Sequence, residues 1–196
     1  MKWLTLILFL PNFFAIAQPL VHEEPHHIPI LENKHVRVLN VVAMQGDTTQ
    51  FHVHENDIAY FTVKGSKILL QELNQEPRMV ELPTGWTGSN LTHSETPLIH
   101  RFANVGDGDF QLIAVEVLSD KFASRNFSKL TESLYEDERF SIQVGEAGVV
   151  ACDVPWILIE LSKSGEINAL DMIKQQQELE LVQKNDSSRM IIIQFK

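Results

Sequence analysis

Short runs rich in hydrophobic and β-branched residues alternate with turn-forming residues along most of the chain. Seven such runs lie between residues 36 and 118: VRVLNVVAM, FHVH, IAYFTV, KILLQEL, RMVELP, LIHRFANV and FQLIAVEVL. Breaks such as GD, KGS, NQEP and VGDGD separate them. Runs of this kind predict β-strands, and their regular spacing with turn residues predicts an antiparallel sandwich or barrel.

A second set of β-type runs follows: FSIQVG, GVVACDVP, WILIELS, LELVQK and RMIIIQF. Three of its segments resemble segments of the first set. LENKHVRVL resembles YEDERFSIQ, IAYFTVKGSKI resembles ILIELSKSGEI, and HRFANVGDGDFQLIAVEV resembles ELVQKNDSSRMIIIQF. We interpret this as a weak internal duplication with a shorter second copy. The segment between the two sets, SDKFASRNFSKLTESLYEDE, is expected to be helical or loop-like, and NALDMIKQQQELE has some helical character.

The start of the chain has the form of an export signal. MKWLTLILFLPNFFAIAQ contains one lysine, an apolar run from Trp3 to Leu10, and the small-x-small sequence Ala15-Ile16-Ala17 that signal peptidases cut. We therefore expect residues 1–17 to be a signal peptide and the mature protein to be secreted or periplasmic. The apolar run is shorter than the roughly 20 residues of a membrane-spanning helix, so no stable membrane anchor is expected.

Composition excludes one class of partner and one kind of stabilisation. The formal net charge is -10 at pH 7, and the acidic residues are scattered along the chain. This argues against a nucleic-acid partner, because phosphates require a basic surface. Cys152 is the only cysteine, so no internal disulfide can form and the fold must depend on its hydrophobic core.

The histidines carry the candidate chemistry. All eight lie at or before His100, so the second set of runs has none. His52 and His54 are two residues apart on a predicted strand, and their side chains therefore point to the same face. Two imidazoles inside a barrel are costly unless their lone pairs are used, and a divalent metal ion uses them. A third ligand from another strand would be His100; the alternative is a histidine pair satisfied by backbone groups or water.

These residues resemble the two motifs of the cupin superfamily. Gly46, five residues, His52-Val53-His54, ten residues and Gly65 resemble the first motif. His100 and Asn104 resemble the second.

The resemblance covers roughly residues 30 to 118. It implies an all-β fold, a cupin double-stranded β-helix (jelly-roll barrel), with a second, shorter vestigial cupin-like half as in a bicupin. The expected organisation is a barrel over 18–118, a connector over 119–133 and a degenerate repeat over 134–196. The resemblance also implies that His52, His54 and His100 bind one divalent metal ion, whether Fe, Mn, Ni, Cu or Zn.

One residue departs from the first motif. The family's glutamate would fall four residues after His54, where this chain has Ile58. Its neighbours Glu55 and Asp57 do not simply replace it, because a one-residue offset on a strand sends the side chain to the opposite face. A replacement ligand could come from the pair His93 and Glu95 if their strand faced inward.

Other residues near the motifs have simpler interpretations. The leader VHEEPHH is expected to be solvated, with a metal-scavenging tail as the alternative; its histidines are His22, His26 and His27. Three aromatic residues are expected in the core: Tyr60, Trp86 and Trp156. Arg101 follows His100 directly and is expected to face away from it.

Three functional hypotheses from different classes follow. Three neutral imidazoles leave open positions on a metal ion that keeps its full charge, which favours a small chelating organic substrate. Three-histidine cupins include dioxygenases, so the resemblance implies such an enzyme as the first hypothesis. The second is a non-catalytic binding protein for a sugar or organic acid. The third is a structural module whose sheets pair across a homodimer.

Overall fold

The computed structural model describes residues 17–119, 133–145, 148–152, 156–173, 177–181 and 189–195. The first half of the chain contains one 3-10 turn, η1 (Val21–Glu23), and nine strands: β1 (His27–Glu32), β2 (Val36–Ala43), β3 (His52–His54), β4 (Ile58–Lys64), β5 (Ser66–Glu72), β6 (Arg78–Leu82), β7 (Thr87–Asn90), β8 (Leu98–Asn104) and β9 (Phe110–Val117). The described residues of the second half form seven: β10 (Ser133–Glu136), β11 (Phe140–Gly145), β12 (Gly148–Cys152), β13 (Trp156–Leu161), β14 (Ile167–Ile173), β15 (Gln177–Leu181) and β16 (Arg189–Phe195).

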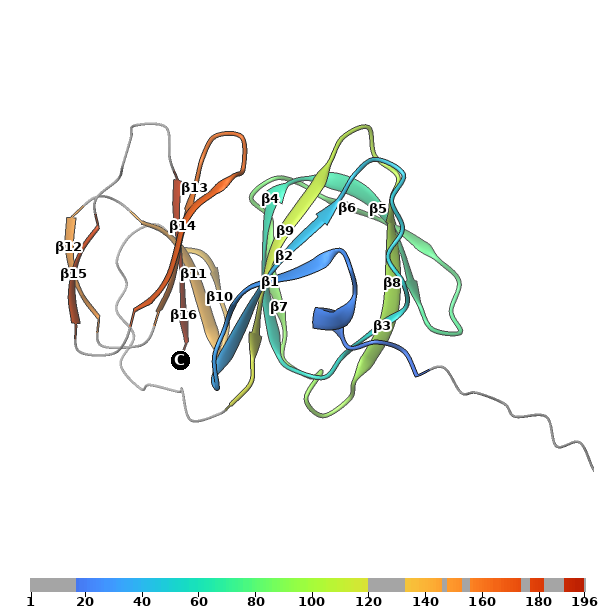
Figure 1. Cartoon of the computed structure of the whole chain (residues 1–196), viewed down its shortest axis with the longest axis horizontal. Helices are drawn as coiled ribbons and strands as arrows, with labels where there is room; N and C mark the ends of the chain where they lie inside the picture. The colour runs from blue at the N-terminus through green and yellow to red at the C-terminus, as the bar shows by residue number, and fades with distance from the viewer. Residues whose placement is uncertain are drawn as a thin grey trace, which may run out of the picture.

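The strands of the first half form a jelly-roll barrel from two antiparallel sheets. One sheet has the strand order β1-β2-β9-β4-β7, and the other has the order β3-β8-β5-β6. Figure 1 shows the two sheets facing each other across the interior of the barrel. This arrangement confirms the all-β barrel that the spacing of the runs predicts.

Strict alternation of side chains gives the first sheet a hydrophobic core on each face. On β9, Ile113 and Val115 face outward, while Leu112 and Ala114 belong to the cluster inside the barrel. Since both faces are covered, every residue of β9 is buried. This explains why FQLIAVEV reads as a continuous hydrophobic run rather than as an alternating one.

The second half packs against the outer face of that sheet. Its five-stranded sheet has the order β10-β11-β16-β13-β14, and β12 pairs with β15 separately. Side chains of both sheets form one buried cluster, in which Phe61 and Val115 of the barrel join Ile159 and Ile193 of the second half. Figure 1 shows this second sheet beside the barrel, with β12 and β15 farther out.

The strand orders place the three resembling sequence pairs at corresponding positions. β10-β11-β16-β13 follows the same connectivity as β1-β2-β9-β4, and the pair β12-β15 corresponds to β3-β8. That the second half is a degenerate cupin barrel stays a prediction.

The expected helical character around residues 168–180 is wrong, because the described part of this segment lies in β14 and β15. Local propensity there is overridden by pairing with β13 and β12. The connector lies largely outside the described residues, which resume at β10. Residues 1–16 of the expected signal peptide also lie outside them. In the described part of the chain, no helix has the length and hydrophobicity needed to cross a membrane.

The backbone explains why two positions of the first motif are glycines. Gly46 has φ of 86° in the turn after β2, a conformation that side chains disfavour. At Gly65, between β4 and β5, an added Cβ would collide with the backbone of residues 82–84. Both turns set the course of the strands around the histidines.

Candidate metal centre

Strands β3 and β8 bring the three predicted ligands together. In their antiparallel pairing, His52 lies opposite His100. The ring centres are 5.0 Å apart for His52 and His54, 4.6 Å for His52 and His100, and 4.8 Å for His54 and His100. One ligand atom from each ring lies within 4.8 Å of the other two. The three rings therefore converge on one region of the barrel interior.

The ring nitrogens leave lone pairs unused in this region. His52 Nδ1 donates to the carbonyl oxygen of Gln50 at 2.9 Å, because a carbonyl can only accept. Its Nε2 consequently keeps its lone pair, and this atom is buried without a hydrogen-bond partner among the described residues. The Nε2 atoms of His54 and His100 lie 2.8 Å apart. Buried polar atoms without partners are costly, and a cation that accepts these lone pairs would remove that cost.

Burial keeps these imidazoles uncharged at neutral pH. Desolvation, with a smaller contribution from His27, lowers the pKa of His52 to about 4. Burial also lowers the pKa of His54 and of His100 well below the ordinary value, and neighbouring histidines add to both shifts. A neutral imidazole is the form that binds a metal ion, so the three side chains fit a divalent cation.

Position 58 points into the barrel, as the first motif implies. Ile58 is fully buried and belongs to the interior cluster with Leu39 and Ala114. The side chain that would supply a carboxylate in the family is therefore an alkyl group at the matching place.

The leader is the largest correction to the sequence analysis, because it is not solvated throughout. Glu24 is 1% exposed and His27 is 5% exposed. His27 begins β1, and its ring centre is 4.4 Å from that of His52. His22 instead lies outside the group of converging histidines, and its Nδ1 is 2.9 Å from Arg37 Nη1. Hydrophobic periodicity could not reveal this burial, because it depends on hydrogen bonds to residues distant in the sequence.

His93 also approaches the cluster. It lies in the turn between β7 and β8, is buried, and has its ring centre 5.2 Å from that of His54. Burial lowers its pKa. Glu95, its expected companion, is exposed. The condition for the replacement pair, an inward-facing strand, is not met, because these positions lie in a turn; His93 alone reaches the group of histidines.

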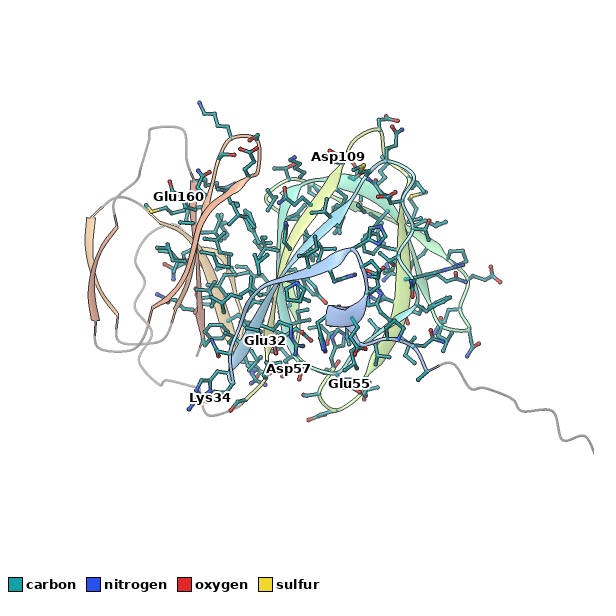
Figure 2. The ribbon with its side chains drawn as sticks, in the orientation of Figure 1. Glu32, Lys34, Glu55, Asp57, Asp109 and Glu160 are labelled. Atoms are coloured by element: carbon teal, nitrogen blue, oxygen red, sulfur yellow. The ribbon has the colours of Figure 1, made fainter. Side chains whose placement is uncertain are left out.

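The acidic residues that follow His54 lie away from the converging histidines. Glu55 is exposed, whereas Asp57 is buried and accepts hydrogen bonds from Ser94 and Arg139. Figure 2 shows Glu55 and Asp57 at the same end of the barrel. Arg101 faces away from the histidines as expected, since Nε donates to Gln71 Oε1 at 2.9 Å.

No family model matches the sequence, and no curated protein matches it either. Solved structures do resemble it. AerE from Microcystis aeruginosa aligns with 88% of this chain and 98% of its own length, at 13% identity and a TM-score of 0.50. A cupin domain from Bordetella pertussis aligns with 53% of this chain and 99% of its own length, at 19% identity and a TM-score of 0.42. A cupin family protein with a double-stranded β-helix fold from Methanocaldococcus jannaschii aligns with 58% of this chain and 93% of its own length, at 15% identity and a TM-score of 0.38.

The chain shares its overall fold with AerE, and its first half is an antiparallel jelly-roll barrel, the architecture that the resemblance to cupins implies. At these low identities the similarity describes the fold alone. What the barrel holds must therefore be argued from its own residues.

The barrel contains a cavity of about 660 Å³. This volume lies in the range of small-molecule sites. His27, His54, His93 and His100 line it together with mainly apolar side chains. Trp86, which is 38% exposed, also lines the cavity, so its expected place in the core is wrong. The side chain of Trp156 lies outside the described residues.

Three polar groups in the cavity could orient a ligand. Burial raises the pKa of Tyr60, so its hydroxyl stays protonated and can donate a hydrogen bond. The expectation that Tyr60 is a core residue is confirmed only in part, because its ring borders both the interior cluster and the cavity. Glu72 and Arg78 also line the cavity and provide a charge of each sign.

Proposed function

We propose that this protein is an exported cupin that binds a divalent metal ion through His52, His54 and His100 and acts on a small organic molecule that chelates the ion. The observation that carries the proposal is the convergence of three imidazoles, two buried and one partly buried, one of them with an unpartnered Nε2, beside a cavity of about 660 Å³. Three neutral ligands leave the charge of a divalent ion uncompensated, which favours an anionic substrate. The metal species is left open among Fe, Mn, Ni, Cu and Zn.

The reaction class proposed is oxygenation of the chelating substrate. A bound ion would supply Lewis acidity and open coordination positions. The chain's own residues would hold the substrate: Arg78 would pair with an anionic group, and Tyr60 would donate a hydrogen bond. The apolar walls would exclude water and hold the carbon skeleton.

Export is supported by the apolar run from Trp3 to Leu10 and by the sequence Ala15-Ile16-Ala17. The proposed location is extracellular or periplasmic. Sequencing the amino terminus of protein recovered from expressing cells would identify the cleavage site, which we place after Ala17.

Metal analysis of untagged protein tests the proposal. We expect a single transition-metal ion per chain in the wild type and none in His52→Ala or His100→Ala, each of which should keep its β-sheet circular dichroism. His35→Ala is the matched control, because His35 lies between β1 and β2 and is not one of the converging ligands. The metal-loaded protein should then consume oxygen with a member of a panel of diketones, thiols and catechols. A wild type without metal overturns the metal site, whereas metal without turnover overturns only the enzyme.

A non-catalytic binding protein is the second candidate, and Ile58 favours it. Without a carboxylate at this position, the cavity has one fewer anionic ligand for a cation. In that case a sugar or organic acid would bind the metal-free protein, and calorimetry would find the same affinity before and after treatment with a chelator.

A further inference from the structure

The residues that precede β1 are fixed against β3. The backbone N–H of Val53 donates to the carbonyl oxygen of Pro19 at 2.9 Å, and Leu20 forms a bridge with Val53. Val21 is buried in the interior cluster of the barrel. These contacts hold η1 and the start of β1 beside the strand that carries His52 and His54.

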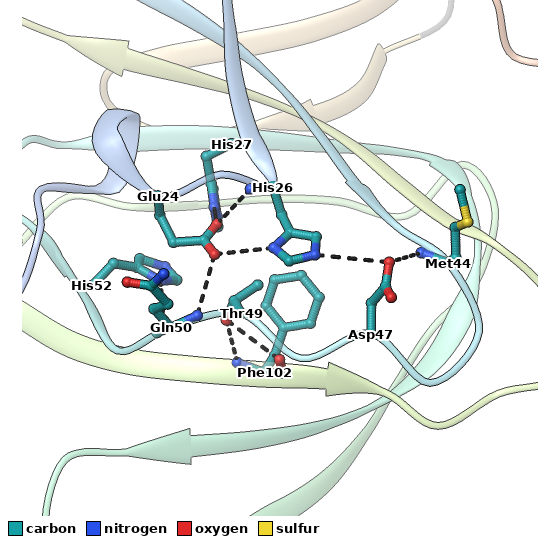
Figure 3. Close-up of polar contacts among 9 residues, drawn as sticks. All are labelled: Glu24, His26, His27, Met44, Asp47, Thr49, Gln50, His52 and Phe102. Carbon is teal, nitrogen blue, oxygen red and sulfur yellow. Dashed lines mark hydrogen bonds and ion pairs between the residues drawn. The ribbon is translucent and has the colours of Figure 1, made fainter.

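Glu24 uses this position to place a buried carboxylate behind the histidines. Its Oε2 accepts hydrogen bonds from His27 Nδ1 at 2.6 Å and from the backbone N–H of His26 at 2.9 Å. Its Oε1 accepts from His26 Nδ1 at 3.0 Å and from the backbone N–H of Gln50 at 3.2 Å. Figure 3 shows Glu24 at the centre of these contacts, with His27 and His52 close by.

Both oxygens of Glu24 accept a hydrogen bond from a backbone N–H group, Oε2 from His26 and Oε1 from Gln50, as a carboxylate does. A carboxylate can only accept, so His27 Nδ1 carries the hydrogen of its contact with Glu24. With Nδ1 as the donor, the lone pair of the His27 imidazole is on Nε2.

His27 and His52 therefore share an arrangement that is usual for metal ligands. Each donates Nδ1–H to an oxygen, of Glu24 and Gln50 respectively, and retains the lone pair of Nε2. His27 lines the same cavity as His54 and His100. Glu24, His27 and His52 also form a second group whose ligand atoms lie within 4.8 Å of one another. His52 is thus common to two groups that could hold an ion.

The ring separations place His27 beside His52 and across from His54, although its ligand atom is grouped with those of Glu24 and His52 and not with those of His54 and His100. In an octahedral or square-planar site, imidazoles that bind one ion through nitrogen at about 2.1 Å have ring centres roughly 4.5 Å apart when adjacent and roughly 6.5 Å apart when opposite. The centres of His27 and His52 are 4.4 Å apart, and those of His27 and His54 are 6.4 Å apart. The ring centres of His52, His54 and His100 are 4.6 to 5.0 Å apart in their three pairs.

We propose that His27 is a fourth imidazole ligand of the metal ion held by His52, His54 and His100, and that Glu24 is the positioning residue that orients it. This inference rests on the proposed metal site. The amino-terminal segment would then replace the carboxylate ligand that is missing at Ile58. It would supply a fourth ligand and a nearby negative charge, both from outside the two sequence motifs.

The first test counts imidazoles in the intact protein. Pulsed electron paramagnetic resonance of the wild type loaded with Cu(II) should detect four coordinated imidazoles, and His27→Ala should show three. Three in both proteins would overturn the inference and leave the proposed function intact. Two copper ions per chain would also overturn it, because the second ion would occupy the Glu24, His27 and His52 group. A wild type that binds no copper would overturn both the inference and the proposed function.

The second test measures affinity by competition with a chelator. His27→Ala and Glu24→Gln should each weaken Cu(II) binding about 10- to 100-fold, the usual cost of losing a ligand's support. His22→Ala and Glu23→Gln are matched controls from the same segment, since His22 contacts Arg37 and Glu23 is exposed. Both should bind copper like the wild type. Equal affinity in all four variants would overturn the inference, and thermal melting of the metal-free proteins separates loss of a ligand from loss of the fold.

Discussion

The two faces of the sheet β1-β2-β9-β4-β7 lead to two different kinds of interior. The outer face packs against the second half through a buried apolar cluster, which includes Phe61, Val115 and Ile159. The inner face borders the cavity and the histidines. One sheet therefore supports an apolar interface that stabilises the fold and, on its other side, an open space where polar groups gather. Stability and ligand binding should accordingly be separable by substitutions on opposite faces.

The two halves differ at corresponding strand pairs. β3 and β8 carry His52, His54 and His100, whereas β12 and β15 carry no histidine. The barrel half also has the segment with Glu24 and His27 ahead of its second strand. The comparison shows that similar strand order does not by itself create a site; the imidazoles and the segment that supports them do.

Phe61 and Phe110 provide the strongest test of the two faces. Both side chains are about 1% exposed, but Phe61 lies in the cluster between the sheets and Phe110 lines the cavity. Each change to alanine should lower the free energy of unfolding by about 3–5 kcal/mol, because a large buried ring is lost. Denaturant titration measures this effect. Phe61→Ala should leave the metal affinity of the folded protein unchanged, whereas Phe110→Ala should change the binding of any cavity ligand.

The pair is its own control, because the deleted group is the same on both faces. A change in metal affinity for Phe61→Ala would show that the second half supports the site. A loss below about 1 kcal/mol would show that the sheets can part without cost, contrary to a close-packed interface.

Ile58→Glu tests the inner face alone. The new carboxylate would point into the barrel, as Ile58 does. We expect it to tighten metal binding about tenfold, equivalent to about 1.4 kcal/mol, and to destabilise the metal-free protein because an unpaired carboxylate is buried. Chelator competition and denaturant titration measure the two effects.

Ile58→Gln is the matched control, with the same shape and no charge. If the glutamate and glutamine variants retain metal equally, position 58 does not face the ion. The strand register of the first motif would then be wrong.

The sequence predicted the barrel and the three converging histidines well, for a physical reason. Strand alternation fixes that His52 and His54 share a face, and the turn glycines fix how β4 and β5 follow them. The contribution of Glu24 and His27 could not be predicted in this way. Their segment has no hydrophobic period, and its position depends on backbone contacts with β3 and on the N–H of Gln50, 26 residues from Glu24 in the sequence. The only signal was the clustering of histidine and glutamate in VHEEPHH.

The place of Trp86 was misjudged, and that of His93 was left open, for a related reason. Both lie near chain reversals, where the period of two that governs a strand no longer tells which side chains point inward. His93 is in the turn before β8, and Trp86 precedes β7. Side chains on such connections reach a cavity through loop geometry, which composition and alternation do not encode.

The smallest expected effect concerns the link between the two regions at Asp57. Its carboxylate accepts hydrogen bonds from Ser94, next to His93 in the barrel, and from Arg139 of the second half. Asp57→Asn keeps the shape but removes the charge. Because Arg139 is partly exposed, we expect a loss of only about 1 kcal/mol in unfolding free energy, smaller still in 1 M salt.

Asp107→Asn, at an exposed position in the β8–β9 turn, is the control and should change nothing measurable. Denaturant titrations at low and high salt make the comparison. Metal affinity should stay at the wild-type value, since Asp57 contacts the turn that carries His93 and not the four proposed ligands. An equal loss in both variants would mean that this carboxylate does not help to join the halves, and a weakened metal site would mean that the second half acts on the barrel through it.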